Sequence, residues 1–411
     1  MSCRAQQLDY ARTVIDTLCS PTMHGRGYVD QGDKLAAQFI AEEFRKAGLK
    51  KYSPNYFQPF TTPVNSFPDQ MMLSINGKLL KPGEDFLIEP GAPGIRGKYN
   101  VQVLTPDDLL DKNILRQKLS KARSGFVVVS AFDKSKYSAE QNKQINDAIS
   151  FLKYSDENPV KGTIILTADK LTWSGSTEVL SKPSFIVKSL VVNEAATTVE
   201  VSVTNKFIRN HETQNVIGYL EGLKKDSLIV FTAHYDHLGR MGKDTMFPGA
   251  NDNASGVSLL LNLMKHFSKK QPDYTTVFIA FAAEEIGLVG SSYFTSHPTF
   301  PLNKIKFLIN FDLAGTGEDG VQVVNGKLYT TEFEKLTQLN DQGKLLKQVK
   351  VRGEACNSDH CLFHSKGVPC FYVYTLGGIQ AYHDIYDRPE TLPLTEYLDY
   401  LNLIIQFAES L

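Results

Sequence analysis

The chain has 411 residues, of which 42% are hydrophobic, so it is long enough to bury the core of one large domain or two ordinary ones. Its 44 basic and 45 acidic residues give a net charge of −1, which offers no field for attracting nucleic acid or an anionic membrane surface. No apolar run approaches the roughly eighteen residues of a membrane-spanning helix. We therefore expect a globular protein with no nucleic-acid partner and no membrane span.

The five cysteines are an odd number and include no CxxC pair, so the sequence contains neither a zinc ribbon nor a thioredoxin-type redox pair. A single disulfide, for instance between Cys356 and Cys361, remains possible. The first residues lack the basic and apolar regions of a signal peptide, and we interpret residues 3–6 (CRAQ) as the remnant of a trimmed export signal. This interpretation predicts an exported protein, either periplasmic or secreted.

The first clear element lies at 33–47, where apolar side chains at helical spacing predict an amphipathic surface helix. Residues 52–94 are rich in Pro, Asn and Gly and contain only short strand-like runs, as expected of irregular segments on a larger body. Between about 95 and 206, short β-type runs surround a helix-favouring stretch near 135–154. This region predicts a small β-rich domain inserted into the main fold.

From residue 215 onward, apolar runs of strand length alternate with helical stretches. Continuous apolar runs are typical of strands buried on both faces, and their alternation with helices predicts an α/β fold with a mixed, largely parallel sheet flanked by helices. We accordingly predict three segments: the N-terminal part of the catalytic domain at 1–94, the inserted domain at 95–206 and the main catalytic domain at 207–411.

Histidine and acidic side chains follow the predicted strands of the main domain. In open α/β sheets, sites form outside the carboxyl ends of the strands, so these side chains are expected to meet at one edge. They are His234 and Asp236 after 228–233, Glu284 and Glu285 after 276–283, Asp312 after 306–311, Tyr382 and His383 after 370–375 and a glycine turn, and Asp252 ahead of a helix at 254–268.

Each of these residues alone has an ordinary explanation as a hydrogen-bonded loop histidine, a helix cap or a solvated charge. Their common position at strand ends favours one shared site. A turn after the adjacent Glu284 and Glu285 lets both face inward, one as a metal ligand and the other as a base. Nitrogen and carboxylate ligands without cysteine suit zinc, or less well cobalt or manganese. If one carboxylate bridges two ions, the site holds two Zn²⁺.

Six motifs, spread over about 215–411, resemble those of a known family. They read AHYDHLG, GANDNASG, AAEEIGLVGS, NFDLAG, SDHCLFHSKGVP and AYHDIYDRPET in chain order. They are similar to motifs of the di-zinc aminopeptidases of the bacterial leucyl aminopeptidase and aminopeptidase Y type, to which glutamate carboxypeptidase and glutaminyl cyclase are related. The resemblance implies the zinc-exopeptidase fold, with a phosphorylase/hydrolase-like architecture. It also implies that 95–206 is the protease-associated domain that members of this family often carry.

The resemblance further implies which residues hold the metal. His234 and Asp312 would bind one zinc ion, Glu285 and His383 the other, and Asp252 would bridge the two.

Three more residues receive implied catalytic roles. Glu284 would be the general base for a metal-bridging water, Asp236 would orient His234, and Tyr382 would help to hold the tetrahedral intermediate. The implied activity is that of a zinc-dependent aminopeptidase acting on peptides. A carboxypeptidase, a dipeptidase or a glutaminyl cyclase on the same fold, and a non-catalytic peptide-binding relative, remain as alternatives.

Overall fold

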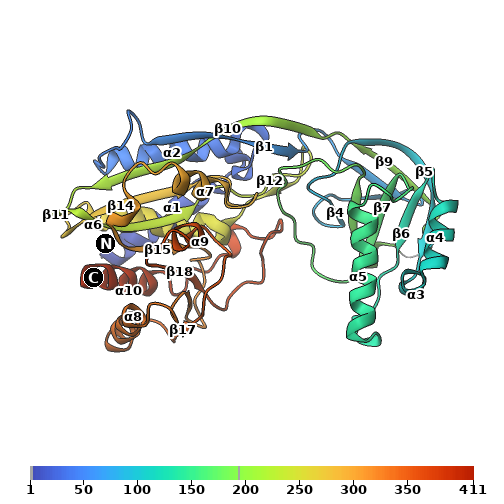
Figure 1. The fold of residues 1–411 in the computed structure, drawn as a ribbon. Helices are drawn as coiled ribbons and strands as arrows, with labels where there is room; N and C mark the ends of the chain where they lie inside the picture. Colours follow the sequence, from blue (N-terminus) through green and yellow to red (C-terminus); the bar gives the residue numbers. More distant parts are fainter. Residues whose placement is uncertain (1–2, 193–194) are drawn as a thin grey trace.

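The computed structural model describes residues 3–192 and 195–411 and shows a chain divided into two lobes (Figure 1). We call residues 3–66 and 206–411 the main lobe, and the described residues between 72 and 203 the second lobe. Each lobe is built on an eight-stranded sheet. Residues 1–2, directly ahead of the predicted export-signal remnant, and residues 193–194 of the predicted insert lie outside the described residues.

The main sheet has the strand order β1-β10-β14-β11-β15-β18-β16-β17. Its centre is parallel, because β11 pairs in parallel with β14 and β15, and β15 pairs in parallel with β18. Toward the edges, β10 is antiparallel to β1 and β14, and β16 is antiparallel to β18. The predicted α/β fold with a mixed, largely parallel sheet is thus confirmed. The strands are β1 (Phe57–Ser66), β10 (Lys206–Leu220), β11 (Lys224–His234), β14 (Tyr274–Phe281), β15 (Ile305–Phe311), β16 (Val321–Val324), β17 (Val349–Val351) and β18 (Cys370–Thr375).

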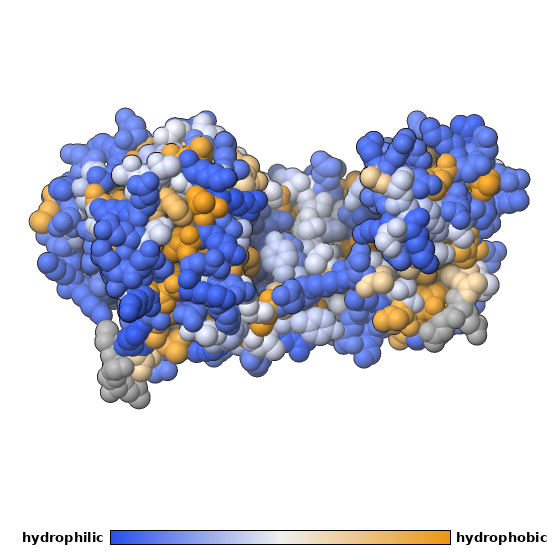
Figure 2. Space-filling model, turned by 90° about the horizontal axis from the view of Figure 1, so that it is seen from below, coloured by the Kyte–Doolittle hydropathy of each residue, from blue (hydrophilic) through white to orange (hydrophobic). Residues whose placement is uncertain are grey.

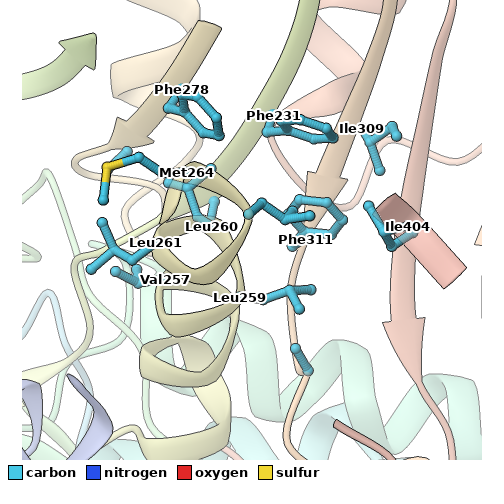
Figure 3. Packing of buried hydrophobic residues seen from close by; sticks show 14 of the residues in the cluster. Phe231, Val257, Leu259, Leu260, Leu261, Met264, Phe278, Ile309, Phe311 and Ile404 are labelled. Carbon is cyan, nitrogen blue, oxygen red and sulfur yellow. The ribbon is translucent and has the colours of Figure 1, made fainter. Parts of the chain in front are cut away.

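Helices cover both faces of the main sheet. On one face, Phe231 and Phe278 of the central strands share a buried cluster with residues of α1, α2, α6 and α10. Figure 3 shows these two rings with side chains of α6 and with Ile404 of α10. On the other face, Val230 and Val277 pack with Phe294 of α7. Because successive strand side chains point to opposite faces, this two-sided burial explains the uninterrupted apolar runs of the sequence. The helices are α1 (Cys3–Leu18), α2 (Gly32–Lys46), α6 (Gly256–Phe267), α7 (Val289–Ser296), α8 (Thr330–Gly343), α9 (His360–His364) and α10 (Tyr397–Ser410).

The second lobe has the strand order β3-β2-β9-β5-β6-β7-β8-β4. This sheet takes in residues 72–88, which the sequence-based boundary at residue 95 had placed in the main domain. Those strands are short and pair with β9 and β8 more than ninety residues later, a relation that a local pattern does not reveal. The elements are β2 (Met72–Ile75), β3 (Lys78–Leu80), β4 (Phe86–Ile88), β5 (Ile95–Leu104), β6 (Phe126–Val129), β7 (Gly162–Thr167), β8 (Ser184–Lys188), β9 (Thr198–Val203), α3 (Pro106–Leu110), α4 (Lys112–Lys121) and α5 (Ala139–Tyr154).

The two lobes are joined by more than the strands that run between them. The hydrophobic cluster of the second lobe includes Leu238, Phe247 and Ile385 from loops of the main lobe. Phe247 stacks on Trp173 of the second lobe, with ring centroids 4.9 Å apart. Seen from below, a hollow separates the lobes on the outer surface (Figure 2). The buried contact means that loops of the main lobe depend on the second lobe for part of their packing.

Two further observations complete the fold. Within the part of the chain that the structure describes, none of the helices combines the length and apolarity needed to cross a membrane. Cys356 and Cys361 form a disulfide, the pairing that the sequence left possible, whereas Cys19 and Cys370 are buried free thiols. The disulfide closes the loop ahead of α9, which lies against β15 and β18.

Candidate metal centre

The main sheet brings the predicted site residues to one edge. His234 is the last residue of β11, Asp312 directly follows β15, and Glu284 and Glu285 follow β14 after a short turn. Because these parallel strands are neighbours in the sheet, their carboxyl ends deliver the side chains to one place. The remaining members come from two loops and are Asp252, ahead of α6, and His383, beyond β18.

Asp252 lies between the two histidines. Its Oδ1 is 3.4 Å from His234 Nε2, and its Oδ2 is 3.0 Å from His383 Nε2. His234 Nε2 is also 3.4 Å from Asp312 Oδ2, and His383 Nε2 is 3.1 Å from Glu285 Oε2. Two ligands of a tetrahedral zinc ion lie about 3.3 Å apart when the metal–ligand bonds are about 2.0–2.1 Å. The spacing therefore fits two cations, each between one histidine and one carboxylate, with Asp252 shared.

The charge of the site also fits cations. The carboxylates of Asp252, Glu284, Glu285 and Asp312 are crowded into a largely buried space, and uncompensated buried charge is costly. Asp312 Oδ1 is buried without a hydrogen-bond partner among the described residues. Burial raises the pKa of Asp312 and raises that of Glu284 well above its usual range. Bound cations would relieve this repulsion.

Both histidines are oriented through their second ring nitrogen. His234 Nδ1 lies 3.2 Å from the main-chain oxygen of Asp236, and His383 Nδ1 lies 2.8 Å from that of Trp173. A carbonyl oxygen only accepts, so Nδ1 must be the donor in each contact. In its neutral form each ring then presents the lone pair of Nε2 toward the carboxylate cluster, as a metal ligand requires.

The carboxylate of Asp236 does not hold His234 in this structure, although the family resemblance implied that role for it. Its Oδ1 lies 3.8 Å from His234 Nδ1, which is beyond hydrogen-bonding distance. The carboxylate instead accepts hydrogen bonds from the main-chain N–H groups of Glu284 and Glu285, at 3.1 and 3.3 Å. Its burial raises the pKa of Asp236 to about 7. Asp236 thus holds the backbone of the predicted base and of one predicted ligand, and only its carbonyl orients His234.

Tyr382 covers the ring of His383. The two rings are stacked, with centroids 4.0 Å apart and planes inclined by 14°. Tyr382 is 45% exposed, so part of its side chain faces solvent. Its part in holding a tetrahedral intermediate stays a prediction.

The backbone next to several site residues adopts the left-handed region. Ala283, Leu313 and His383 have φ values of 58°, 50° and 53°, and each such non-glycine residue costs about 1 kcal/mol or more. These residues precede Glu284, follow Asp312 and form a predicted ligand, respectively. The surrounding contacts therefore hold the ligands in conformations that the isolated chain would avoid.

The sequence reasoning missed three buried residues that support the site. His237 Nδ1 lies 2.6 Å from Glu285 Oε1. The Asp387 carboxylate accepts hydrogen bonds from the main-chain N–H groups of Asn251 and Asp252, at 2.8 and 3.0 Å. Both stand inside quoted motifs, AHYDHLG and AYHDIYDRPET, so a closer reading of those motifs would have found them.

Arg26 is the third of these residues. It is fully buried, and its guanidinium donates to the main-chain oxygens of Leu18, Tyr235, Pro248 and Gly249 at 2.7–3.1 Å. It also reaches the oxygen of Asp252 at 3.3 Å. Arg26 thereby fixes both ends of the loop from 235 to 252. No sequence signal marks it, because it lies more than two hundred residues ahead of that loop.

Comparison with known proteins agrees with this geometry. Residues 215–408, which contain every predicted site residue, match the family described as Peptidase family M28. This segment of the chain belongs to peptidase family M28. The chain is 24% identical over 348 residues to aminopeptidase YwaD of Bacillus subtilis, covering 82% of this chain and 69% of that protein. It is 27% identical over 197 residues to leucine aminopeptidase 2 of Arthroderma otae, covering 45% of this chain but only 38% of that protein.

Solved structures share the fold over almost the whole chain. The peptidase M28 precursor from Shewanella amazonensis aligns with a TM-score of 0.71 at 17% identity, over 98% of this chain and 95% of that one. The zinc aminopeptidase BSAP of Bacillus subtilis aligns with a TM-score of 0.68 at 20% identity, over 98% of this chain and 94% of that one. The fold that this chain shares with these structures therefore extends beyond residues 215–408, the segment that matches the M28 family.

Proposed function

We propose that the protein is a zinc-dependent aminopeptidase that holds two ions, with Asp252 shared between them. The observation that carries the proposal is a set of four histidine–carboxylate distances of 3.0–3.4 Å, two for each histidine, with one oxygen of Asp252 in each pair. The M28 match over 215–408 and the aminopeptidase names of the relatives support the same activity. Zinc, when bound, supplies a Lewis acid that polarises the peptide carbonyl and activates water.

Glu284 is the proposed general base. One of its carboxylate oxygens lies in a group of potential ligand atoms with a ring nitrogen of His234 and an oxygen of Asp312. Glu284 makes none of the histidine–carboxylate contacts of 3.0–3.4 Å around Asp252. Burial raises its pKa well above the usual range, and nearby cations act in the opposite direction. Because these two effects oppose each other, the pKa of the Glu284 carboxyl suits a group that takes a proton from the attacking water and returns it to the leaving amine.

The charge around the site favours a substrate amino end. The buried Asp359 adds a further carboxyl, whose burial raises its pKa to about 6. A carboxypeptidase needs a cation for the substrate carboxylate. Arg26 is committed to main-chain oxygens and Lys170 to Asp384, and Arg240, which lines a cavity with Glu285, is held by the Lys243 oxygen and by Asp30. An excess of acidic groups instead suits a protonated amine.

The proposal is tested with paired peptides that differ only in an acetylated or free amino end. Mass spectrometry should show stepwise loss of N-terminal residues from the free peptide and none from the acetylated one, and chelation should stop the reaction. Removal of C-terminal residues, or cyclisation of N-terminal glutamine with loss of ammonia, would overturn it. Elemental analysis should find two zinc ions per chain, whereas one would overturn the shared-ligand arrangement.

Glu284→Gln tests the assignment of the base. We expect turnover to fall by about 10²- to 10⁴-fold while two zinc ions remain bound. Glu390→Gln is the matched control, because Glu390 is exposed on the surface. Loss of zinc in the Glu284→Gln protein would show that Glu284 is a ligand and not the base.

We also propose that the protein is exported. The Cys356–Cys361 disulfide supports this proposal, because structural disulfides persist mainly in oxidising compartments. Fractionation of the producing cells should place the protein outside the cytoplasm, and a cytoplasmic protein with reduced cysteines would overturn the proposal.

A further inference from the structure

We propose that the second lobe completes the metal centre: residues 170–175, which we call the bridging segment, position His383 and set the affinity of the ion held by Glu285 and His383. This inference rests on the proposed function, because it concerns one of the two proposed zinc ions. It assigns the second lobe a role in metal binding that is separate from substrate access.

The bridging segment pairs with His383 through the main chain of Trp173. The carbonyl oxygen of Trp173 accepts from His383 Nδ1, and its N–H donates to the carbonyl oxygen of His383, both at 2.8 Å. The first contact fixes the ring tautomer that leaves Nε2 free for a metal. The second fixes the backbone from which that ring projects. Ring and backbone of His383 are therefore held together by one residue of the other lobe.

Lys170 makes a second connection to the same loop. Its Nζ lies 2.7 Å from Asp384 Oδ2 and donates to the main-chain oxygens of Gln380 and Tyr382, at 2.5 and 3.1 Å. An ammonium group has three donors, so these contacts use all of them. Asp384 is buried, which makes this ion pair less screened than one between exposed side chains. Lys170 thus clamps the chain on both sides of His383.

The bridging segment is itself firmly anchored. Trp173 is 7% exposed, its Nε1 donates to the main-chain oxygen of Ile88 at 2.8 Å, and its ring stacks on Phe247. At Gly175 a Cβ atom would lie 2.3 Å from the Ile286 side chain, next to the predicted ligand Glu285. Such close contact leaves no room for a larger residue. The segment is therefore held from the second lobe and from loops that flank two ligands.

The two proposed ions differ in how much they depend on this support. His234 ends a central strand, and its Nδ1 partner is a carbonyl of its own loop. His383 lies within residues 376–388, all of which the structure describes and none of which is helical or in a strand. Its left-handed backbone needs external contacts to persist. Loss of the bridging contacts should consequently weaken the Glu285–His383 ion and spare the His234–Asp312 ion.

The test is a zinc titration of the chelator-stripped whole protein against a chromogenic competitor, with Lys170→Met as the main variant. We expect one of two dissociation constants to rise about 10- to 100-fold, as is usual when a group behind a ligand is lost. Lys170→Arg should restore most of the affinity, because guanidinium also donates to Asp384 and to carbonyls. Lys143→Met is the control, since Lys143 pairs with Asp147 within α5 of the same lobe.

To assign the loss of affinity to one ion, Lys170→Met is combined with each of two substitutions of predicted ligands. With Asp312→Asn present, the Glu285–His383 ion remains, and Lys170→Met should weaken it by the same factor. With His383→Gln present, Lys170→Met should change nothing. Trp173→Ala gives a second route, expected to act on the same ion. Equal weakening of both ions with a lowered melting temperature, or no change in either, would overturn the inference. A wild-type protein that binds no zinc would instead overturn the proposed function itself.

Discussion

His237 Nδ1 lies 2.6 Å from Glu285 Oε1, and the histidine is completely buried. The other oxygen of the same carboxylate faces His383. Burial lowers the pKa of His237, although Glu285 opposes this shift, so the ring is a neutral donor at physiological pH. His237 therefore fixes which oxygen of Glu285 remains for the metal.

His237→Phe preserves the shape of the ring but removes the donor. We expect zinc affinity at the Glu285–His383 position to fall about 10- to 100-fold, because a ligand without its outer partner is free to rotate. His237→Asn keeps an N–H near the Nδ1 position and should lose much less. Zinc titration of both variants provides the measurement, and equal losses would show that the hydrogen bond is unimportant.

Arg26 is expected to matter more for folding than for chemistry. Arg26→Met leaves the main-chain oxygens of Leu18, Tyr235 and Pro248 without this donor, whereas the Gly249 oxygen still accepts from the N–H of Ala254 at 3.2 Å. An unsatisfied buried polar group costs about 1–3 kcal/mol, so the free energy of unfolding should fall by at least about 3 kcal/mol. Denaturant titration of the zinc-free protein measures this, with the exposed Arg116→Met as control. A loss below 1 kcal/mol would mean that water replaces the guanidinium.

Because of the buried His360, we expect the free energy of unfolding to depend on pH in the acid range. Its Nε2 donates to the Ala355 oxygen at 2.9 Å, and burial lowers its pKa to about 4. The His360 imidazole therefore binds a proton more tightly in the unfolded chain than in the folded one. The free energy of unfolding decreases as pH falls from about 6.5 to about 4. A shift of this size corresponds to about 3 kcal/mol at most. His360→Gln keeps a donor but does not titrate, so its unfolding free energy should vary less over that range. Parallel slopes for both zinc-free proteins would contradict the assignment.

The site could be predicted because its signals are local. His234, Glu285 and Asp312 each follow an apolar run, and the rule for strand ends brings such residues together without any knowledge of strand order. The structure adds hydrogen bonds that the local sequence does not indicate, since His383 is held by Trp173, and Asp252 by Arg26. These contacts join distant segments and depend on tertiary packing.

The fold shows the same division between local and distant information. The central strands of the main sheet, β11, β14, β15 and β18, have continuous apolar runs and were predicted, whereas β1 (Phe57–Ser66) at the edge of that sheet and β5 (Ile95–Leu104) of the second lobe were not. Both alternate between exposed and more buried side chains and include Pro, Gly or Asn, so their sequences resemble irregular segments. β1 becomes a strand because it pairs along β10, and that pairing partner is encoded almost 150 residues later.

Removal of zinc should reverse the effect of a ligand substitution on stability. Asp312 is buried beside Asp252, and burial raises its pKa, so without metal its carboxylate destabilises the native state. Asp312→Asn removes this charge and should therefore raise the melting temperature of the stripped protein. With zinc present the order should invert, because an ion at 100 times its dissociation constant stabilises the native state by about 2.7 kcal/mol.

Thermal unfolding with chelator and with added zinc measures both comparisons. The exposed Asp341→Asn controls for the loss of one negative charge, and surface substitutions usually stay within about 0.5 kcal/mol of wild type. An Asp312→Asn protein that is less stable under both conditions would show that this carboxylate serves the fold. If Asp312→Asn is more stable than wild type with chelator but less stable with zinc, the carboxylates at the sheet edge destabilise the metal-free fold and are needed for the metal.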